Sequence, residues 1–270
     1  MDSTNMPSAQ PIPRAAAAEI VARLEAELAR APERTLLASD ADGTIWDGDV
    51  GIDLFEALLA ARGVREAARD ALAAEAREHG VADGGDANTL ANRLYDAYHT
   101  DRYPHDRAFA MMAWSFAGWR RDEAAAFCAG VLNEGRIDAR IRPELLSIFR
   151  WADARAVAAY VVSASCSVMI EVAAPRLGIP LDRVVAMTPA AGDDGVLLPR
   201  LAGPIVYGEG KLVALEAARP GARTALLGAF GDSTYDAAML RAARVPVAVT
   251  PAPGLVALAP TIAGLVVLAR

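Results

Sequence analysis

The chain has 270 residues, of which 54% are hydrophobic, and it carries a net charge of -7 at pH 7. This length and composition can bury a substantial core, so we expect one large globular domain or a core with a smaller module. The acidic balance offers no clustered positive charge for nucleic acid or for an anionic membrane surface, so neither is expected as a partner. A small-molecule ligand and a monomer or homodimer are expected instead.

The ends of the chain and its two cysteines carry little functional signal. Residues 1–13 are polar and proline-rich, which predicts a disordered tail without a secretory signal. The apolar C-terminal stretch is interrupted by prolines, so no membrane-spanning segment of about 20 residues is predicted. Cys128 and Cys166 lack the spacing of a zinc site or a disulfide framework. We therefore expect a cytoplasmic protein with reduced cysteines.

The predicted elements alternate between helix and strand. The first helix places Ile20, Leu24 and Leu28 on one apolar stripe, and a buried strand over 35–39 then ends at Asp40. Further apolar runs, each followed by a turn or helix signal, occupy residues 156–162, 183–187, 224–230 and 245–249. This alternation indicates a doubly wound α/β fold, in which helices cover both faces of a parallel sheet. Ligands of such folds bind at the carboxyl ends of the strands.

Residues 50–142 are predicted to form a helical domain inserted between the first two strands of a core made of 14–49 and 143–270. The insertion is rich in Ala, Arg, Asp and Glu and holds all 3 histidines. Its aromatic side chains either fill the core of a small helical module or form a surface that faces the substrate. These side chains include Tyr95, Tyr98, Tyr103, Trp114 and Trp119.

A pair of carboxylates follows the first strand. Asp40 and Asp42 are separated by one residue, so in an extended segment both side chains project to the same side. Paired carboxylates either bind a hard cation such as Mg²⁺ or divide the nucleophile and acid/base roles between them. A simple Asp-Gly turn at Asp42 and Gly43 is the alternative.

A second acidic pair, Asp232 and Asp236, follows the apolar run at 224–230. Gly231 permits a tight exit from that strand, and Asp236 lies one helical turn beyond Asp232. Carboxylates gathered at neighbouring strand ends repel one another. A divalent cation at this edge of the sheet would remove that conflict.

Two other polar residues stand out. The hydroxyl of Ser163 and the backbone amides that follow it, beginning at Ala164, can hold an anion at the start of the next helix, although Ser163 can equally cap that helix. Lys211 is the one lysine among 27 lysine and arginine residues. Because other cations in this chain are arginines, Lys211 marks either a site that needs a compact ammonium group or a chance occurrence.

Together these residues form four motifs in chain order: Asp-Ala-Asp-Gly-Thr at 40–44, Ser163, Lys211, and Gly-Asp-Ser-Thr-Tyr-Asp at 231–236. The set, which spans roughly residues 36–249, resembles the haloacid dehalogenase-like (HAD) superfamily of hydrolases. The resemblance implies a Rossmann-like core, and the helical insertion is similar to the C1 cap of that superfamily. The segments around Ser163 and Lys211 are most similar to the phosphoserine phosphatase branch.

The resemblance implies a role for each motif residue. Asp40 would attack phosphorus and form an aspartyl-phosphate, and Asp42 would act as the general acid and base. Ser163 would hydrogen-bond a phosphoryl oxygen. Lys211 would offset the negative charge on the phosphate and on Asp40.

The same resemblance implies a Mg²⁺ site. The metal ligands would be the side chains of Asp40 and Asp232 and the backbone carbonyl of Asp42, with Asp236 as a ligand or a supporting residue.

Substrate choice is less defined by the sequence. By resemblance to phosphoserine phosphatases, Asp49 is expected to bind a substrate amine, with Asp47 and Asp53 as nearby alternatives. An arginine of the insertion would then bind a substrate carboxylate, and Arg93 is selected from a set that also holds Arg102, Arg107, Arg120 and Arg121. Trp46 is expected near the substrate, as a ring larger than this branch usually carries.

The resulting prediction is a Mg²⁺-dependent phosphomonoesterase that acts on a small phosphorylated metabolite, with an amino-acid phosphate as one option. A phosphotransferase or mutase of the same superfamily would use Asp40 identically and is the alternative. A phosphate-binding module without turnover is a further alternative. A haloacid dehalogenase is disfavoured, because that branch lacks the acid/base residue at the position of Asp42.

Overall fold

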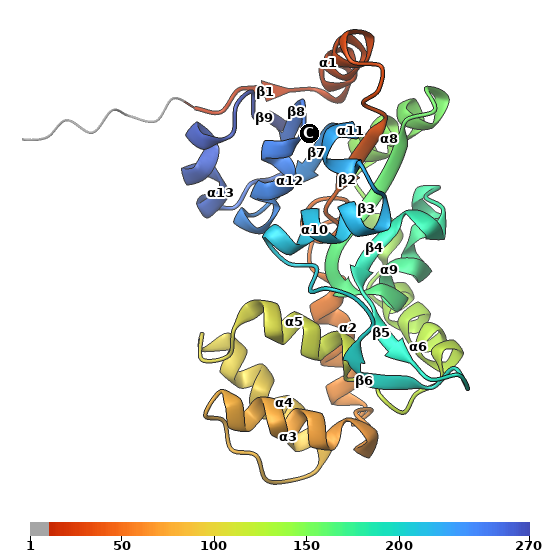
Figure 1. Cartoon of the computed structure of the whole chain (residues 1–270), viewed down its shortest axis with the longest axis vertical. Helices are drawn as coiled ribbons and strands as arrows, with labels where there is room; N and C mark the ends of the chain where they lie inside the picture. The colour runs from red at the N-terminus through yellow and green to blue at the C-terminus, as the bar shows by residue number, and fades with distance from the viewer. Residues whose placement is uncertain (1–10) are drawn as a thin grey trace, which may run out of the picture.

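A seven-stranded parallel sheet forms the centre of the computed structural model, which describes residues 11–270 (Figure 1). The strand order is β1-β9-β8-β7-β2-β3-β4, and each pair of neighbours runs parallel. The expected α/β fold is therefore confirmed. The strands of this sheet are β1 (Arg14–Ala15), β2 (Leu36–Ser39), β3 (Ala158–Cys166), β4 (Val184–Met187), β7 (Leu226–Gly231), β8 (Val245–Ala248) and β9 (Val266–Leu268).

Two pairs of helices pack beside the sheet, and the two members of each pair contact each other. Helix α1 packs against α8 and contacts β7 and β8, while α10 packs against α12, which contacts the same two strands. Every residue of β2 is buried, because this strand lies inside the sheet between β3 and β7. The helices of the core are α1 (Ala17–Arg30), α8 (Pro143–Ala154), α9 (Ser167–Ala173), α10 (Glu209–Ala218), α11 (Ala222–Ala225), α12 (Ala237–Ala242) and α13 (Pro253–Leu258), with 3₁₀ turns η2 (Ala174–Leu177), η3 (Leu181–Arg183), η4 (Thr234–Asp236) and η5 (Ala259–Thr261).

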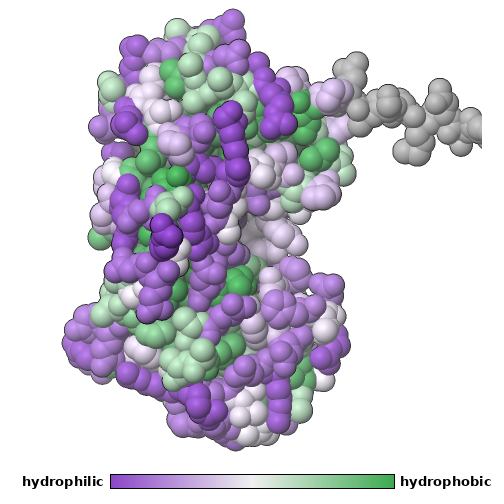
Figure 2. All heavy atoms as spheres, turned by 180° about the vertical axis from the view of Figure 1, so that it is seen from behind, coloured by the Kyte–Doolittle hydropathy of each residue, from purple (hydrophilic) through white to green (hydrophobic). Residues whose placement is uncertain are grey.

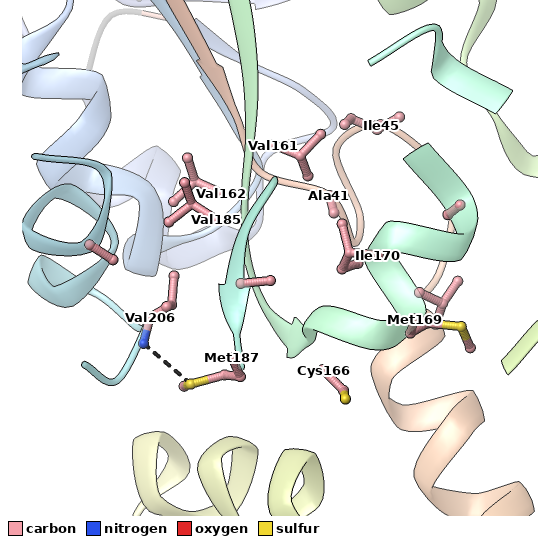
Figure 3. Close-up of a cluster of buried hydrophobic side chains, with 14 of the residues drawn as sticks. Ala41, Ile45, Val161, Val162, Cys166, Met169, Ile170, Val185, Met187 and Val206 are labelled. Atoms are coloured by element: carbon pink, nitrogen blue, oxygen red, sulfur yellow. Dashed lines mark hydrogen bonds between the residues drawn. The ribbon is translucent and has the colours of Figure 1, made fainter. Parts of the chain in front are cut away.

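The apolar core continues below the carboxyl end of the sheet. Figure 3 shows Val162 and Val185 from neighbouring strands beside Val206, whose backbone N–H donates to Met187 Sδ at 3.3 Å. Val206 and Met187 are both buried. This contact fixes the segment that leads from the core to Tyr207 and Lys211.

Helices of residues 50–142 make up much of the lower lobe in Figure 1. Figure 2 shows the two lobes from behind, with a notch between them on one side. Tyr95, Tyr103 and Trp114 are buried in this lobe, whereas Tyr98 is half-buried. The insertion comprises α2 (Val50–Ala60), η1 (Glu66–Ala68), α3 (Arg69–Glu78), α4 (Ala87–His99), α5 (His105–Trp114), α6 (Arg121–Glu134) and α7 (Ile137–Arg140).

The predicted insertion and the predicted core pack against each other at two places. Helix α6 packs against α9 of the core. A hairpin of β5 (Pro189–Ala191) and β6 (Leu197–Leu201), which the sequence placed in the core, packs against α5. An isolated bridge between Arg120 and Val196 adds to this contact. The lower lobe is therefore built from two separate stretches of the chain.

The ends of the described chain are paired to each other. Strand β1 pairs with β9, and the backbone N–H of Val267 donates to the carbonyl of Pro13 at 2.8 Å. Of the predicted tail, residues 1–10 lie outside the described residues. Cys128 and Cys166 are buried and free, as expected. Across residues 11–270, no helix combines the length and the apolar character needed to cross a membrane.

Candidate active site

A cavity of about 470 Å³ lies between the two lobes, at the carboxyl ends of β2, β3 and β7. This volume suits a small metabolite. Parallel strands end at a common edge, so residues distant in sequence meet here. The charged side chains that line the cavity are Asp40, Asp42, Asp49, Asp232 and Lys211, with His105 opposite them in the insertion.

Asp40 is held at the centre of this site. Its backbone N–H donates to the carbonyl of Phe230 on β7, and the Thr44 hydroxyl donates to its Oδ2 at 3.0 Å. Lys211 Nζ donates to its Oδ1 at 2.6 Å. Burial raises the pKa of Asp40 well above its usual range, and the carboxylates of Asp236 and Asp232 raise it further against the lowering effect of Lys211.

Lys211 bridges two carboxylates. Its ammonium group donates to Asp40 Oδ1 and to Asp236 Oδ1, both at 2.6 Å, and its side chain is 4% exposed. Burial disfavours the charged lysine, but the two carboxylates outweigh burial and raise its pKa. Lys211 is therefore charged and fixed in place.

Asp236 stabilises the loop after β7. Its Oδ2 accepts hydrogen bonds from the backbone N–H groups of Asp232 and Ser233 and from the Ser233 hydroxyl, at 3.0–3.1 Å. Its Oδ1 accepts from Lys211. Both oxygens of Asp236 are thus engaged within the protein, so this residue fixes the loop after β7 and also holds Lys211 in place.

The acidic cluster fits a hard divalent cation. One carboxylate oxygen from each of Asp40, Asp232 and Asp236 lies within 4.8 Å of the others. Burial and the neighbouring Asp236 raise the pKa of Asp232 to about 7, because Lys211 alone does not balance three carboxylates. Oxygen ligands on rigid strand ends are the donor set that Mg²⁺ prefers.

Asp42 has a different environment, because three donors hold its carboxylate. Trp46 Nε1 and the backbone N–H of Val50 donate to Oδ1 at 2.8 and 2.7 Å, and the Ser165 hydroxyl donates to Oδ2 at 2.7 Å. Burial raises the pKa of Asp42, although these three hydrogen bonds act in the opposite direction. Its carboxylate lies outside the acidic cluster that could bind a metal ion.

Trp46 is the first correction to the sequence-based assignment. It is fully buried and does not line the cavity, because its ring packs in the core while its N–H reaches Asp42. Its role in this geometry is to orient Asp42. Ser165, which the sequence analysis did not select, lines the cavity and shares that task.

Ser163 lies deeper than its motif position suggested. Strand β3 continues to Cys166, and the fully buried hydroxyl of Ser163 accepts a hydrogen bond from the backbone N–H of Ser165 at 3.0 Å. The cavity wall at this strand end is formed by Ala164 and Ser165.

Asp49 is the acid of the 47–53 segment that lines the cavity. It caps α2 by accepting the backbone N–H of Ile52 at 2.8 Å. Asp47 pairs with Arg142 and Arg270, and Asp53 pairs with Arg140, all outside the cavity lining. The structure thus separates three acids that the sequence left as alternatives.

The expected substrate-binding arginine is the second correction. Arg93 donates to the carbonyls of Ala82 and Gly84 within the insertion and does not line the cavity. Arg107 and Arg121 are paired with Glu75 and Glu171. Neither of these arginines lines the cavity, and Arg102 and Arg120 are likewise absent from its lining.

The sequence analysis missed most of the ring side chains at the site. Tyr207 precedes Lys211 by four positions, and Tyr235 lies inside the fourth motif. Phe109 and His105 occur one turn apart on α5. All four line the cavity together with Tyr98. Proximity to the motif residues was the available signal for Tyr207 and Tyr235.

Comparisons with known proteins place the sequence in a family. The sequence profile of the haloacid dehalogenase-like hydrolases matches residues 37–241. No curated protein matches the chain significantly. A solved structure described as a protein of unknown function from Bordetella pertussis Tohama I superposes with a TM-score of 0.68 at 22% identity, over 87% of this chain and 98% of that one.

Two other solved structures share the fold. A substrate-bound phosphoserine phosphatase superposes with a TM-score of 0.52 at 14% identity, over 88% of this chain and 93% of that one. Cytosolic 5'-nucleotidase IIIB bound to cytidine gives a TM-score of 0.57 at 14% identity, over 92% and 84% of the respective chains. At these identities the likeness is one of fold.

Gly43 provides a test of the acidic cluster. Its φ is +73°, and a Cβ at this position would lie 2.4 Å from Asp232 Oδ2. We expect Gly43→Ala to displace Asp232 and to weaken Mg²⁺ binding at least about tenfold, measured by isothermal titration calorimetry. The control is Gly195→Ala, which has a similar φ of +77° but open space around the new methyl group. Equal Mg²⁺ affinity in both variants would contradict the assignment of Asp232.

The raised pKa values predict a pH dependence of stability. In the metal-free protein Asp40 and Asp232 retain protons that they lose in the unfolded chain, so stability falls as the pH rises from about 4 through about 7. Thermal unfolding in EDTA should show Tm lower at pH 8 than at pH 5 by about 4 °C or more. Saturating Mg²⁺ should remove most of this difference. If added Mg²⁺ left Tm unchanged at every pH, the acidic cluster would not be a Mg²⁺ site.

Proposed function

The chain belongs to the haloacid dehalogenase-like hydrolase family, and we propose that it is a Mg²⁺-dependent phosphomonoesterase acting on a small phosphorylated metabolite. One observation carries this proposal. Asp40 and Asp42 line the same cavity in contrasting environments, one bridged by a lysine and crowded by acids, the other held by three hydrogen-bond donors. Two carboxylates in distinct environments can divide the nucleophile and acid/base roles.

Asp40 is the proposed nucleophile. Its carboxylate oxygen attacks phosphorus, the ester P–O bond breaks, and an aspartyl-phosphate forms. Lys211 and the Thr44 hydroxyl hold the attacking group in a fixed orientation, which reduces the entropic part of the barrier. The positive charge of Lys211 also offsets the repulsion between Asp40 and the phosphate dianion.

Asp42 is the proposed general acid and base. Burial raises the pKa of Asp42, which favours the protonated form that gives a proton to the departing alkoxide. It then takes a proton from the water that attacks the aspartyl-phosphate, which releases phosphate and restores Asp40. Trp46 and Ser165 fix the direction of its two oxygens throughout.

The side chains of Asp40 and Asp232 would hold Mg²⁺, with the backbone carbonyl of Asp42 as a further ligand and Asp236 positioning Lys211. Bound Mg²⁺ would supply positive charge that stabilises the phosphoryl oxygens. Ser163 would support phosphate binding indirectly, because its hydroxyl accepts from the backbone N–H of Ser165 and so holds the main chain at Ala164 and Ser165. Two of the neighbouring structures are described as a phosphoserine phosphatase and a 5'-nucleotidase, and these names support a phosphate ester as the substrate class.

Replacement of Asp40 tests the proposal. We expect Asp40→Asn to lower the rate of phosphate release from p-nitrophenyl phosphate by about 10³-fold or more, because the amide is a poor nucleophile. Asp70→Asn is the control, since Asp70 has a fully exposed side chain far from the motifs. Full activity of Asp40→Asn would exclude Asp40 as the nucleophile.

The same assay separates the alternatives. Adding an acceptor alcohol and measuring phosphate release against phosphoryl transfer identifies a phosphotransferase if transfer dominates. Binding of phosphate and Mg²⁺ without any turnover would identify a phosphate-binding module instead.

A further inference from the structure

Five ring side chains line the cavity beside the acidic cluster. They come from both lobes: Tyr98 from α4, His105 and Phe109 from α5, Tyr207 from the segment before α10, and Tyr235 from η4. A substrate held at Asp40 would therefore extend into a space that is lined by aromatic rings. Aromatic rings are not needed to bind a phosphate group, so these rings bear on the part of the substrate that carries the phosphate.

The rings form a continuous wall. The ring centroids of Tyr207 and Tyr235 are 4.3 Å apart, and those of Phe109 and Tyr207 are 5.6 Å apart. Tyr98 continues the wall, at 6.0 Å from Phe109 and 4.9 Å from His105. The backbone carbonyl of Tyr207 accepts from Gly210 N–H at 2.8 Å, which holds this tyrosine against the start of α10.

One acid accompanies these rings. Asp49 lines the cavity and makes no ion pair with any of the residues 11–270. Burial and the nearby Asp42 raise the pKa of Asp49 to about 8. A positive charge beside this carboxylate would offset both effects and restore its ionised form.

No cationic group in the described lining is free to bind a carboxylate. The lining contains no arginine, and Lys211 is held between Asp40 and Asp236. His105 Nε2 lies 3.0 Å from Asp101 Oδ1, and its Nδ1 faces the hydroxyl groups of two tyrosines at 3.5 Å. A substrate that carries both an ammonium and a carboxylate group would therefore leave its carboxylate without a cationic partner in this cavity.

We propose that the substrate is a phosphomonoester whose alcohol carries an alkylated ammonium group and no carboxylate. Aromatic rings attract alkylammonium cations through the negative face of the π-system, and a neighbouring carboxylate adds a direct charge interaction. Tyr98, Phe109, Tyr207 and Tyr235 supply the rings, and Asp49 supplies the charge. This inference rests on the proposed phosphatase function and specifies the substrate of the same site.

Rings also stack on nucleobases, so a nucleoside monophosphate is the competing occupant. Asp49 decides between the two. A neutral base can donate an N–H to Asp49 but brings no positive charge, whereas an ammonium group neutralises the carboxylate.

A matched pair of substrates tests the inference. Phosphocholine and 3,3-dimethylbutyl phosphate have the same shape and differ in the positive charge. We expect kcat/KM to be at least about tenfold higher for phosphocholine, and at least about tenfold higher than for phosphoserine. A preference for phosphoserine or for AMP, or equal values for the charged and neutral isosteres, would overturn the inference.

Variants identify the groups responsible. Asp49→Asn should reduce the ratio of kcat/KM between phosphocholine and its neutral isostere to about 1, and Phe109→Leu should reduce it about threefold. Asp53→Asn is the matched control, since Asp53 lies in the first turn of α2 and pairs with Arg140. It should leave the ratio unchanged. A ratio that survives Asp49→Asn would also overturn the inference.

The outcomes separate this inference from the proposed function. If the neutral isostere and p-nitrophenyl phosphate are hydrolysed as well as phosphocholine, the phosphatase stands and the cationic substrate is wrong. If no phosphomonoester is hydrolysed in the presence of Mg²⁺, the proposed function itself is wrong.

Discussion

The ammonium group of Lys211 between Asp40 and Asp236 is the interaction on which the rest of the site depends. Three carboxylates converge within 4.8 Å, and the raised pKa values of Asp40 and Asp232 record their mutual repulsion and burial. One buried cation relieves part of that repulsion and fixes the proposed nucleophile. The remaining negative charge of the cluster fits the divalent cation that we propose for this site.

The topology of the sheet brings these groups together. Strand β2 lies beside β7, with Ser39 opposite Phe230, so the residues that follow each strand meet at one edge. Helix α10 then delivers Lys211 from its first turn, and the insertion closes over the opposite side of the cavity. The core therefore supplies the acids and the lysine of the site, whereas the rings come from both lobes.

The sequence predicted the parts of the site that follow from strand ends. Asp40, Asp42 and Asp232 could be placed because each follows an apolar strand, whereas Lys211 was selected as the one lysine of the chain. Family membership was predicted from the same residues and is confirmed. Trp46 and Arg93 were misplaced, since the direction of a side chain depends on its packing partners: a core ring in one case and two carbonyl groups in the other. Most members of the aromatic wall were not predicted, because they come from four segments that only the folded chain brings together: α4, α5, the stretch before α10, and η4.

Replacing Lys211 by arginine tests the central claim most directly, because it keeps the charge and changes only its shape. We expect Lys211→Arg to fold with an unchanged circular dichroism spectrum but to lose about 10²-fold or more in kcat with p-nitrophenyl phosphate, since a planar guanidinium cannot occupy the space of the compact ammonium between Asp40 and Asp236. A folded Lys211→Arg variant with kcat within about threefold of the parent protein would contradict it.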